Sequence, residues 1–227
     1  MINVSLENAE VLFTTRAGGT SVGGFSSLNL GSFVGDDPLA VSANLEIVRE
    51  LAGVGRLEIV RQVHGNEIFE PPSGAPAQPP DADGLLTSRR LLGLVVTGAD
   101  CPPLVLATRD HVAVLHCGWR SIAAGIVERG IEALGEASIQ AAIGPGVSAE
   151  HYAVGCEVVT AIGADAEPAY RDGHLSLREI LRLKLARAGV DLAADVDRCT
   201  YAEPAEFFSY RRDGAACGRQ AAVAWRR

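Results

Sequence analysis

Several features that mark particular protein classes are missing from this 227-residue chain. No apolar run reaches the roughly 18 residues that a membrane-spanning helix needs, and the opening stretch MINVSLENAE carries acids where a secretion signal would carry bases. Lysine and arginine form no cluster beyond pairs such as Arg89-Arg90 and Arg211-Arg212, and the net charge is −8. We therefore expect a cytoplasmic protein that binds neither membranes nor nucleic acids.

The cysteine usage does not fit a disulfide framework. The chain has five cysteines, an odd number, at wide spacings and without a secretion signal. This usage favours metal binding, catalysis or simple burial over disulfide bonds. The five residues are Cys101, Cys117, Cys156, Cys199 and Cys217.

The hydrophobic periodicity predicts an α+β fold with a mixed β-sheet core flanked by helices. We expect helices at 41–52, 122–134 and 177–185, and strands at 11–15, 57–63, 92–97, 104–108, 111–116, 138–143 and 220–225. Consecutive strands follow one another before a helix intervenes, which is not the pattern of regular βαβ units. With 48% hydrophobic residues, the chain is long enough for one substantial core, so we expect a single domain over residues 1–227.

Two stretches read as loops. Residues 70–81, EPPSGAPAQPPD, hold five of the eleven prolines and predict an exposed connection between strands. Residues 18–24, GGTSVGG, predict a permissive loop that is neither a Walker loop nor a dinucleotide fingerprint, because no GK[ST] follows and no helix pattern opens behind it.

Three residues with metal-binding side chains stand where apolar runs end. They are His64 in RQVHGNE, Cys101 in GADCPP and His116 in AVLHCGWRS. Their separations of 37 and 15 residues match no compact zinc motif. If their strands are neighbours, however, the side chains meet at one rim of a sheet, where two imidazoles and a thiolate form a three-ligand zinc set with an open fourth position. Taken singly, each is more often a residue buried in the core than a metal ligand.

Eight motifs occur in an order that resembles a known family. They are TTRAGG, SLNLG, RQVHGNE, DADGLLT, VTGADCPPLVLA, AVLHCGWRSIAAGI, AAIGPGVSAEHYAVG and FFSYRRDGAACGR. The sequence resembles the laccase-domain family, also called multicopper polyphenol oxidase-like, which includes zinc-dependent purine nucleoside phosphorylases. The resemblance implies that His64, Cys101 and His116 bind Zn²⁺. It also implies phosphorolysis of adenosine, inosine, guanosine and methylthioadenosine, with adenosine deamination as a further activity.

Two positions beside the expected metal site depart from the family pattern. Ser121 stands where a glycine is usual, and Cys117 stands where an alanine is common. Both flank His116 without replacing a ligand, so they bear on the shape of the pocket more than on the metal.

The implied reactions require further groups. In deamination, zinc acidifies a bound water and a carboxylate shuttles protons; Asp100 is the candidate, and a hydrogen-bonding or capping role is its alternative. In phosphorolysis, planar guanidinium groups suit the phosphate, and Arg16, Arg120 and Arg211 are the candidates because each lies in one of the motifs. An arginine in a loop is otherwise usually a solvated surface residue.

Other activities remain open at this point. A copper-dependent polyphenol oxidase would have too few copper ligands, because the chain has only five histidines and no methionine besides Met1. Copper could still bind a His-Cys-His site adventitiously. A metal-free cysteine hydrolase or transferase could use Cys101 as nucleophile with His116 or His64 as base. A structural zinc clip or redox sensor would have a closed fourth position and no turnover.

Overall fold

The core of the protein consists of two mixed β-sheets. The structure is a computed structural model that describes residues 1–74, 78–135 and 138–227. The first sheet has the order β1 (Ile2–Ser5), β2 (Ala9–Phe13), β13 (Gln220–Arg226), β6 (Leu92–Gly98), β3 (Arg56–Ile59). The second has the order β12 (Asp191–Asp195), β9 (Gln140–Ile143), β7 (Pro103–Ala107), β8 (Val112–His116), β5 (Gly84–Thr87), β4 (Ile68–Phe69). Both contain parallel and antiparallel pairs, and β10 (Tyr170–Arg171) and β11 (His174–Leu175) form a separate two-stranded ribbon.

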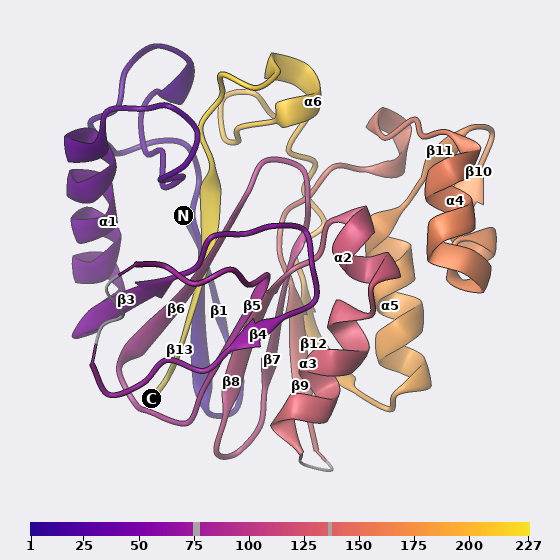
Figure 1. The fold of residues 1–227 in the computed structure, drawn as a ribbon, viewed down its shortest axis with the longest axis horizontal. Coiled ribbons are helices and arrows are strands. Elements are labelled where there is room, and N and C mark those ends of the chain that lie inside the picture. Colours follow the sequence, from indigo (N-terminus) through magenta and orange to yellow (C-terminus); the bar gives the residue numbers. More distant parts are fainter. Residues whose placement is uncertain (75–77, 136–137) are drawn as a thin grey trace.

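Helices cover the outer faces of the two sheets (Figure 1). Helix α1 (Pro38–Ala52) lies against the first sheet, where Val48 packs with Leu12, Val95 and Val223. The second sheet is covered by α2 (Trp119–Ala123), α3 (Ile126–Leu134) and α5 (Leu177–Arg187), and α4 (Cys156–Ile162) packs outside them against α2. Helix α6 (Tyr210–Asp213) lies near one end of the first sheet, shortly before β13.

The central strands are buried on both faces, and this explains their continuous apolar runs. In β7, Leu104 and Leu106 pack toward the helices, whereas Val105 and Ala107 pack in the core between the sheets. Successive side chains of a strand point to opposite faces, so a strand with an apolar layer on each side shows no polar alternation. The two apolar layers therefore account for the run VAVLH in β8, all five residues of which are buried.

The expected α+β class is confirmed, with two mixed sheets in place of one. The expected helix at 122–134 is divided, because Gly125 adopts a left-handed conformation with φ of 86° between α2 and α3. The expected strand at 57–63 ends at Ile59. Strands β1, β4, β5 and β10 to β12 and helices α4 and α6 were not expected, because they are short or lack clear periodicity.

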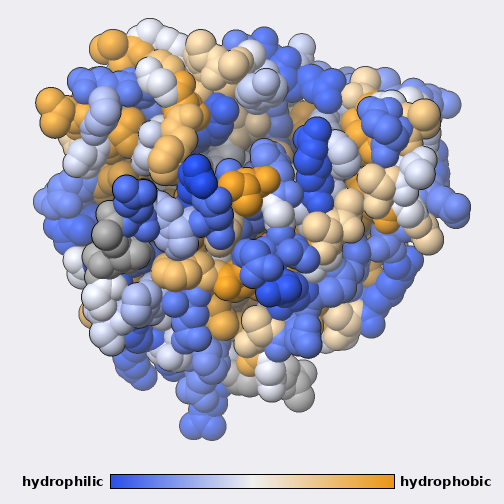
Figure 2. All heavy atoms as spheres, in the orientation of Figure 1, coloured by the Kyte–Doolittle hydropathy of each residue, from blue (hydrophilic) through white to orange (hydrophobic). Residues whose placement is uncertain are grey.

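The surface mixes hydrophobic and hydrophilic residues, as the face in Figure 2 shows. Within the described ranges, no helix is long and apolar enough to cross a membrane. In the expected loop at 70–81, Pro71 is buried, residues 72–74 are exposed, and residues 75–77 lie outside the described residues.

Candidate metal centre

The structure brings His64, Cys101 and His116 together. One ligand atom from each residue lies within 4.8 Å of the others, and the two imidazole rings meet edge to face with centroids 4.9 Å apart. Ligands of a tetrahedral zinc ion are separated by roughly 3.3–3.7 Å, so small side-chain rotations would close the set around an ion. His116 is buried, Cys101 is half-buried and His64 is exposed, so the group opens toward solvent on one side.

Each ligand is placed by a different element. His116 is the last residue of β8, and Cys101 lies in the loop between Gly98 of β6 and Pro103 of β7. This loop crosses from one sheet to the other, and its turn includes Asp100 with a φ of 103°. His64 lies beyond the end of β3, in a turn where its own φ is 58°. Two of the site residues therefore have left-handed backbone conformations, which a non-glycine residue adopts only where its surroundings hold it.

Asp83, which the sequence reasoning missed, holds this arrangement in place. Its fully buried carboxylate accepts hydrogen bonds from the backbone N–H groups of Val63, His64 and Gly65 at 2.7–3.0 Å. It also bonds the Nδ1 atom of His116 at 2.9 Å. One acid thus fixes the turn of His64 and directs the Nε2 atom of His116 toward the site. In the sequence, Asp83 could have been noticed because it is an acid in the motif DADGLLT that directly precedes a buried strand.

The pKa shifts follow from this crowding. Burial alone would lower the pKa of His116, but the charge of Cys101 and the hydrogen bond to Asp83 outweigh it and raise the pKa to about 9. Burial, together with the neighbouring charge of His116, lowers the pKa of His64. Without a metal, the site therefore favours the protonated form of His116, and a divalent cation can replace that proton.

Gly118 is also required by the geometry of the site. A Cβ atom at this position would lie 2.9 Å from Nδ1 of His64 and 3.1 Å from Sγ of Cys101. Any side chain would therefore push two ligands apart. The glycine of HCGWR is explained by this close approach.

We expect Gly118→Ala to weaken metal binding by roughly ten-fold or more, because it displaces two ligands at once. Competition with a chromogenic chelator measures the affinity. Gly74→Ala is the matched control, since a Cβ there meets nothing within 4 Å. An unchanged affinity in Gly118→Ala would show that the ligands bind no metal in this arrangement.

The three ligands line a cavity of about 750 Å³. The cavity is bounded by the ends of β6 and β8, by α2 and by α6, and its walls include Trp119, Tyr152 and Tyr210. Its volume lies within the roughly 300–1,000 Å³ typical of sites that hold small molecules. The candidate metal site is therefore accessible to a ligand, unlike the closed site of a structural zinc clip.

Two of the three predicted arginines lie in this cavity. Arg120, on α2, stacks over Trp119 at 4.2 Å, and Arg211, on α6, stacks over Tyr152 at 5.0 Å. In the described part of the chain, neither guanidinium forms an ion pair with a carboxylate. Both therefore remain available to an anionic ligand.

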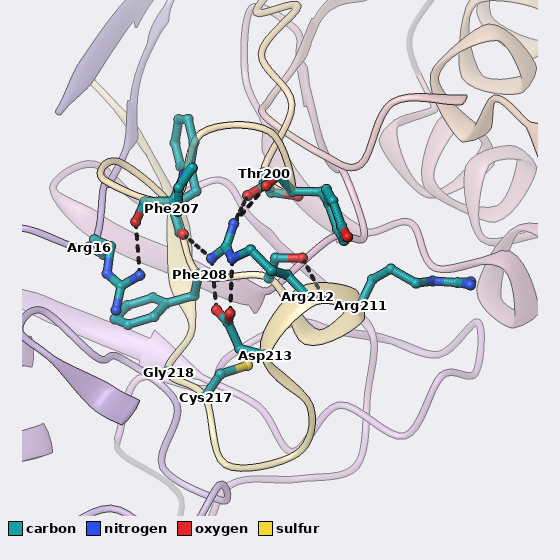
Figure 3. Close-up of polar contacts among 12 residues, drawn as sticks. Arg16, Thr200, Phe207, Phe208, Arg211, Arg212, Asp213, Cys217 and Gly218 are labelled. Carbon is teal, nitrogen blue, oxygen red and sulfur yellow. Dashed lines mark hydrogen bonds and ion pairs between the residues drawn. The ribbon is translucent and has the colours of Figure 1, made fainter. Parts of the chain in front are cut away.

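Arg16 does not line the cavity. Its guanidinium stacks over Phe208 at 4.6 Å and donates to the carbonyls of Ser26 and Pro204 at 3.0 and 2.9 Å. Figure 3 shows Arg16 on the opposite side of the Phe207–Phe208 segment from Arg211. These contacts give Arg16 a role in joining the N-terminal loop to the segment before α6.

Asp100 lines the cavity, but both of its carboxylate oxygens are engaged. Oδ1 accepts a hydrogen bond from Oγ1 of Thr200, and Oδ2 accepts one from the backbone N–H of Arg211, each at 2.7 Å. The backbone turns at Asp100, where φ is 103°. Its contacts tie α6, and with it Arg211, to the metal-binding loop.

The donor set fits a single metal ion. Two imidazoles and a thiolate suit zinc or copper, and the second imidazole is held by a carboxylate in the manner common at metal sites. Across residues 1–74, 78–135 and 138–227, no second group of three metal-binding side chains occurs. The copper cluster of a multicopper oxidase would need further ligands that these ranges do not supply.

Comparisons with known proteins agree with these features. A family model described as "Multi-copper polyphenol oxidoreductase laccase" matches residues 10–227. "Purine nucleoside phosphorylase" of Xylella fastidiosa is 36% identical over 94% of this chain and 91% of its own length. "Purine nucleoside phosphorylase Rv2149c" of Mycobacterium tuberculosis is 38% identical over 98% and 94% of the two chains. The crystal structure of protein NMB0706 of Neisseria meningitidis, 34% identical, matches with a TM-score of 0.91 over 99% of this chain and 98% of that one. The resemblance seen in the motifs is confirmed, and the chain belongs to the multi-copper polyphenol oxidoreductase laccase family.

Proposed function

We propose that the protein is a zinc-dependent purine nucleoside phosphorylase. The observation that carries the proposal is one cavity in which the His64, Cys101 and His116 triad opens toward two arginines without carboxylate partners. The names of the relatives support it. Adenosine, inosine, guanosine and methylthioadenosine are the proposed substrates, and adenosine deamination is a proposed second activity.

Arg120 and Arg211 are the proposed ligands of the attacking phosphate. Each guanidinium presents a planar set of donors that can pair with two phosphate oxygens. Both guanidinium groups stack on aromatic rings. Stacking fixes the plane of each group and leaves its N–H donors available for hydrogen bonds. In a chain of net charge −8, such a concentration of positive charge also attracts an anion into the cavity.

The aromatic walls and the metal centre complete the proposed site. Trp119 and Tyr152 offer flat apolar surface for a purine base. A bound divalent metal would supply Lewis acidity to an oxygen of the phosphate or the nucleoside. Asp100 is retained as the candidate proton-shuttling carboxylate, although its two hydrogen bonds support a positioning role through Arg211.

The test is to incubate protein of measured metal content with adenosine, with and without phosphate. We expect adenine and ribose 1-phosphate only when phosphate is present. Inosine in either buffer would establish deamination. Neither product would contradict the proposed function.

We expect Arg211→Gln to raise the KM for phosphate by roughly ten-fold, because it removes a charged fork from the cavity. Its unfolding free energy should change by less than about 0.5 kcal/mol, since the side chain is exposed. Phosphate titrations and urea unfolding measure the two effects.

The neighbouring Arg212 is the matched control for Arg211. Its guanidinium donates to the carbonyls of Thr200, Tyr201 and Phe207 and pairs with Asp213, as Figure 3 shows. Arg212→Gln should therefore lower the unfolding free energy by about 2–4 kcal/mol. If instead both variants changed only stability, Arg211 would not bind phosphate.

A second candidate function rests on one specific observation. Asp83 bonds His116, and His116 lies beside Cys101, so the three could act as orienting acid, base and nucleophile of a cysteine hydrolase. Metal content separates the two functions, because a metal-bound thiolate is not free to attack. One zinc per chain that survives dialysis would exclude the hydrolase.

A further inference from the structure

A third arginine lines the cavity, and the proposed reaction does not account for it. Arg219 precedes β13 and stacks over Tyr210 at 5.9 Å. Its Nη1 atom donates to the carbonyls of Cys217 and Gly218 at 2.6 and 2.9 Å. Among the described residues, no acceptor bonds Nε or Nη2 and no carboxylate pairs with the group. One nitrogen thus anchors the guanidinium, and the others remain available to a ligand.

The SLNLG motif builds the position of Arg219. The buried Asn29 accepts hydrogen bonds through Oδ1 from the backbone N–H groups of Arg219 and Gly31, at 2.8 and 2.9 Å. The N–H of Leu30 donates to the carbonyl of Arg219 at 3.0 Å. A Cβ atom on Gly31 would lie 2.8 Å from Cγ of Arg219, so only glycine leaves room for this stem. Two motifs far apart in the chain therefore cooperate to place one guanidinium in the cavity.

The three arginines of the cavity stack on different aromatic rings. Arg211 stacks over Tyr152, whereas Arg219 stacks over Tyr210. Arg120 stacks over a third ring, that of Trp119. Each of the three guanidinium groups is therefore held against a different aromatic side chain.

The charges in the cavity exceed what one phosphate needs. Among the described residues, Asp100 is the one carboxylate that lines the cavity, and hydrogen bonds already engage both oxygens of Asp100. Two arginines are sufficient to hold the attacking phosphate through paired hydrogen bonds. A third guanidinium held in a cavity, without a counter-ion, favours a ligand that carries a second anionic group. The volume of about 750 Å³ leaves room for such a ligand.

We propose that Arg219 forms a second anion subsite, which binds the 5′-phosphate of a purine nucleoside 5′-monophosphate. The proposal rests on the proposed function for the placement of the nucleoside, and it extends the ligand class from nucleosides to nucleotides. The SLNLG motif then serves recognition of the ligand, through Asn29 and Gly31, and not only the packing of its loop.

Equilibrium binding of adenosine and adenosine 5′-monophosphate to the metal-loaded enzyme tests the proposal. We expect the nucleotide to bind roughly ten-fold or more tightly than the nucleoside, because it gains charge-assisted hydrogen bonds. The advantage should persist when sulfate fills the site of the attacking phosphate. An advantage abolished by sulfate would place the 5′-phosphate on Arg120 and Arg211 and overturn the proposal.

The variant test uses the ratio of the two affinities. Arg219→Gln should remove most of the nucleotide's advantage, and Arg219→Lys, which keeps the charge but loses the planar fork, should remove part of it. Arg187→Gln is the charge-matched control, because Arg187 is exposed at the end of α5 and pairs with Asp165. A ratio unchanged in Arg219→Gln, or a nucleotide that binds the unmodified enzyme no better than adenosine, would overturn the subsite.

Binding and turnover separate this proposal from the proposed function. If adenosine yields no adenine but the nucleotide binds with an Arg219-dependent advantage, phosphorolysis fails and the subsite stands. If adenosine is cleaved with phosphate and the nucleotide has no advantage, the function stands and the subsite fails.

Discussion

Replacing Cys101 by alanine should reduce the zinc content from about one ion per chain to below about 0.1, and phosphorolysis should fall by roughly 10³-fold or more. A three-ligand set that loses its thiolate keeps two neutral imidazoles, which hold zinc far more weakly. A catalytic metal contributes several kcal/mol to the transition state, and about 4 kcal/mol corresponds to a factor of roughly 10³. Metal analysis after dialysis and adenine release from adenosine measure the two losses together.

Cys156→Ala is the matched control for this experiment. Cys156 is exposed at the start of α4 and does not line the cavity. The Cys156→Ala substitution should leave both the zinc content and the rate of turnover unchanged. Turnover by Cys101→Ala protein without metal would contradict the zinc-dependent function, and loss of activity at full metal occupancy would favour the cysteine nucleophile.

Replacing Asp83 by asparagine should weaken zinc binding by roughly 10–100-fold, as loss of a carboxylate that orients a metal-binding histidine generally does. Each oxygen of Asp83 accepts from two donors: Oδ1 from His64 N and His116 Nδ1, and Oδ2 from Val63 N and Gly65 N. The side-chain NH₂ group of an asparagine, in the place of either oxygen, would point its own donors at two N–H donors. We therefore also expect the unfolding free energy to fall by about 2–4 kcal/mol, since buried donors lose their acceptor.

Asp81 in the same DADGLLT motif offers the control for Asp83. It is exposed and pairs with Arg61, so Asp81→Asn should cost less than about 1 kcal/mol and leave zinc binding unchanged. Chelator competition and urea unfolding measure both quantities. If Asp83→Asn bound zinc normally, the orientation of His116 would not depend on this acid.

The family name and the metal centre point to different chemistry. Multicopper oxidation requires several copper ions, each with its own set of ligands. The described residues hold one cluster of metal-binding side chains, at His64, Cys101 and His116. Copper bound adventitiously in this cluster would supply one redox centre, so the polyphenol oxidase activity in the family's description is not the one that the site supports best.

The main elements of the fold were predictable because their signals are local. The continuous apolar runs of β6, β7 and β8 follow from burial on both faces, and the periodicity of α1 and α5 follows from one apolar stripe. Edge strands such as β4, with two residues, carry too little pattern to be seen. The division of the expected helix depends on the left-handed conformation of Gly125, which the hydrophobic periodicity does not reveal.

The sequence by itself determined the chemistry of the candidate metal site. The order of the motifs identified His64, Cys101 and His116 through the family resemblance, because the pattern alone also allowed burial in the core or a cysteine nucleophile. The sequence also identified Arg120 and Arg211 as candidates, although it could not separate them from Arg16.

Only the tertiary structure decided which groups meet. Asp83 reaches His116 and the turn of His64 across strands, and Asn29 reaches Arg219 across 190 residues of chain. Arg211 and Arg212 are adjacent and chemically identical, yet one faces the cavity and the other binds backbone carbonyls. The reason is that a hydrogen bond depends on distance and direction in space, and neither quantity is encoded in the spacing of residues along the chain.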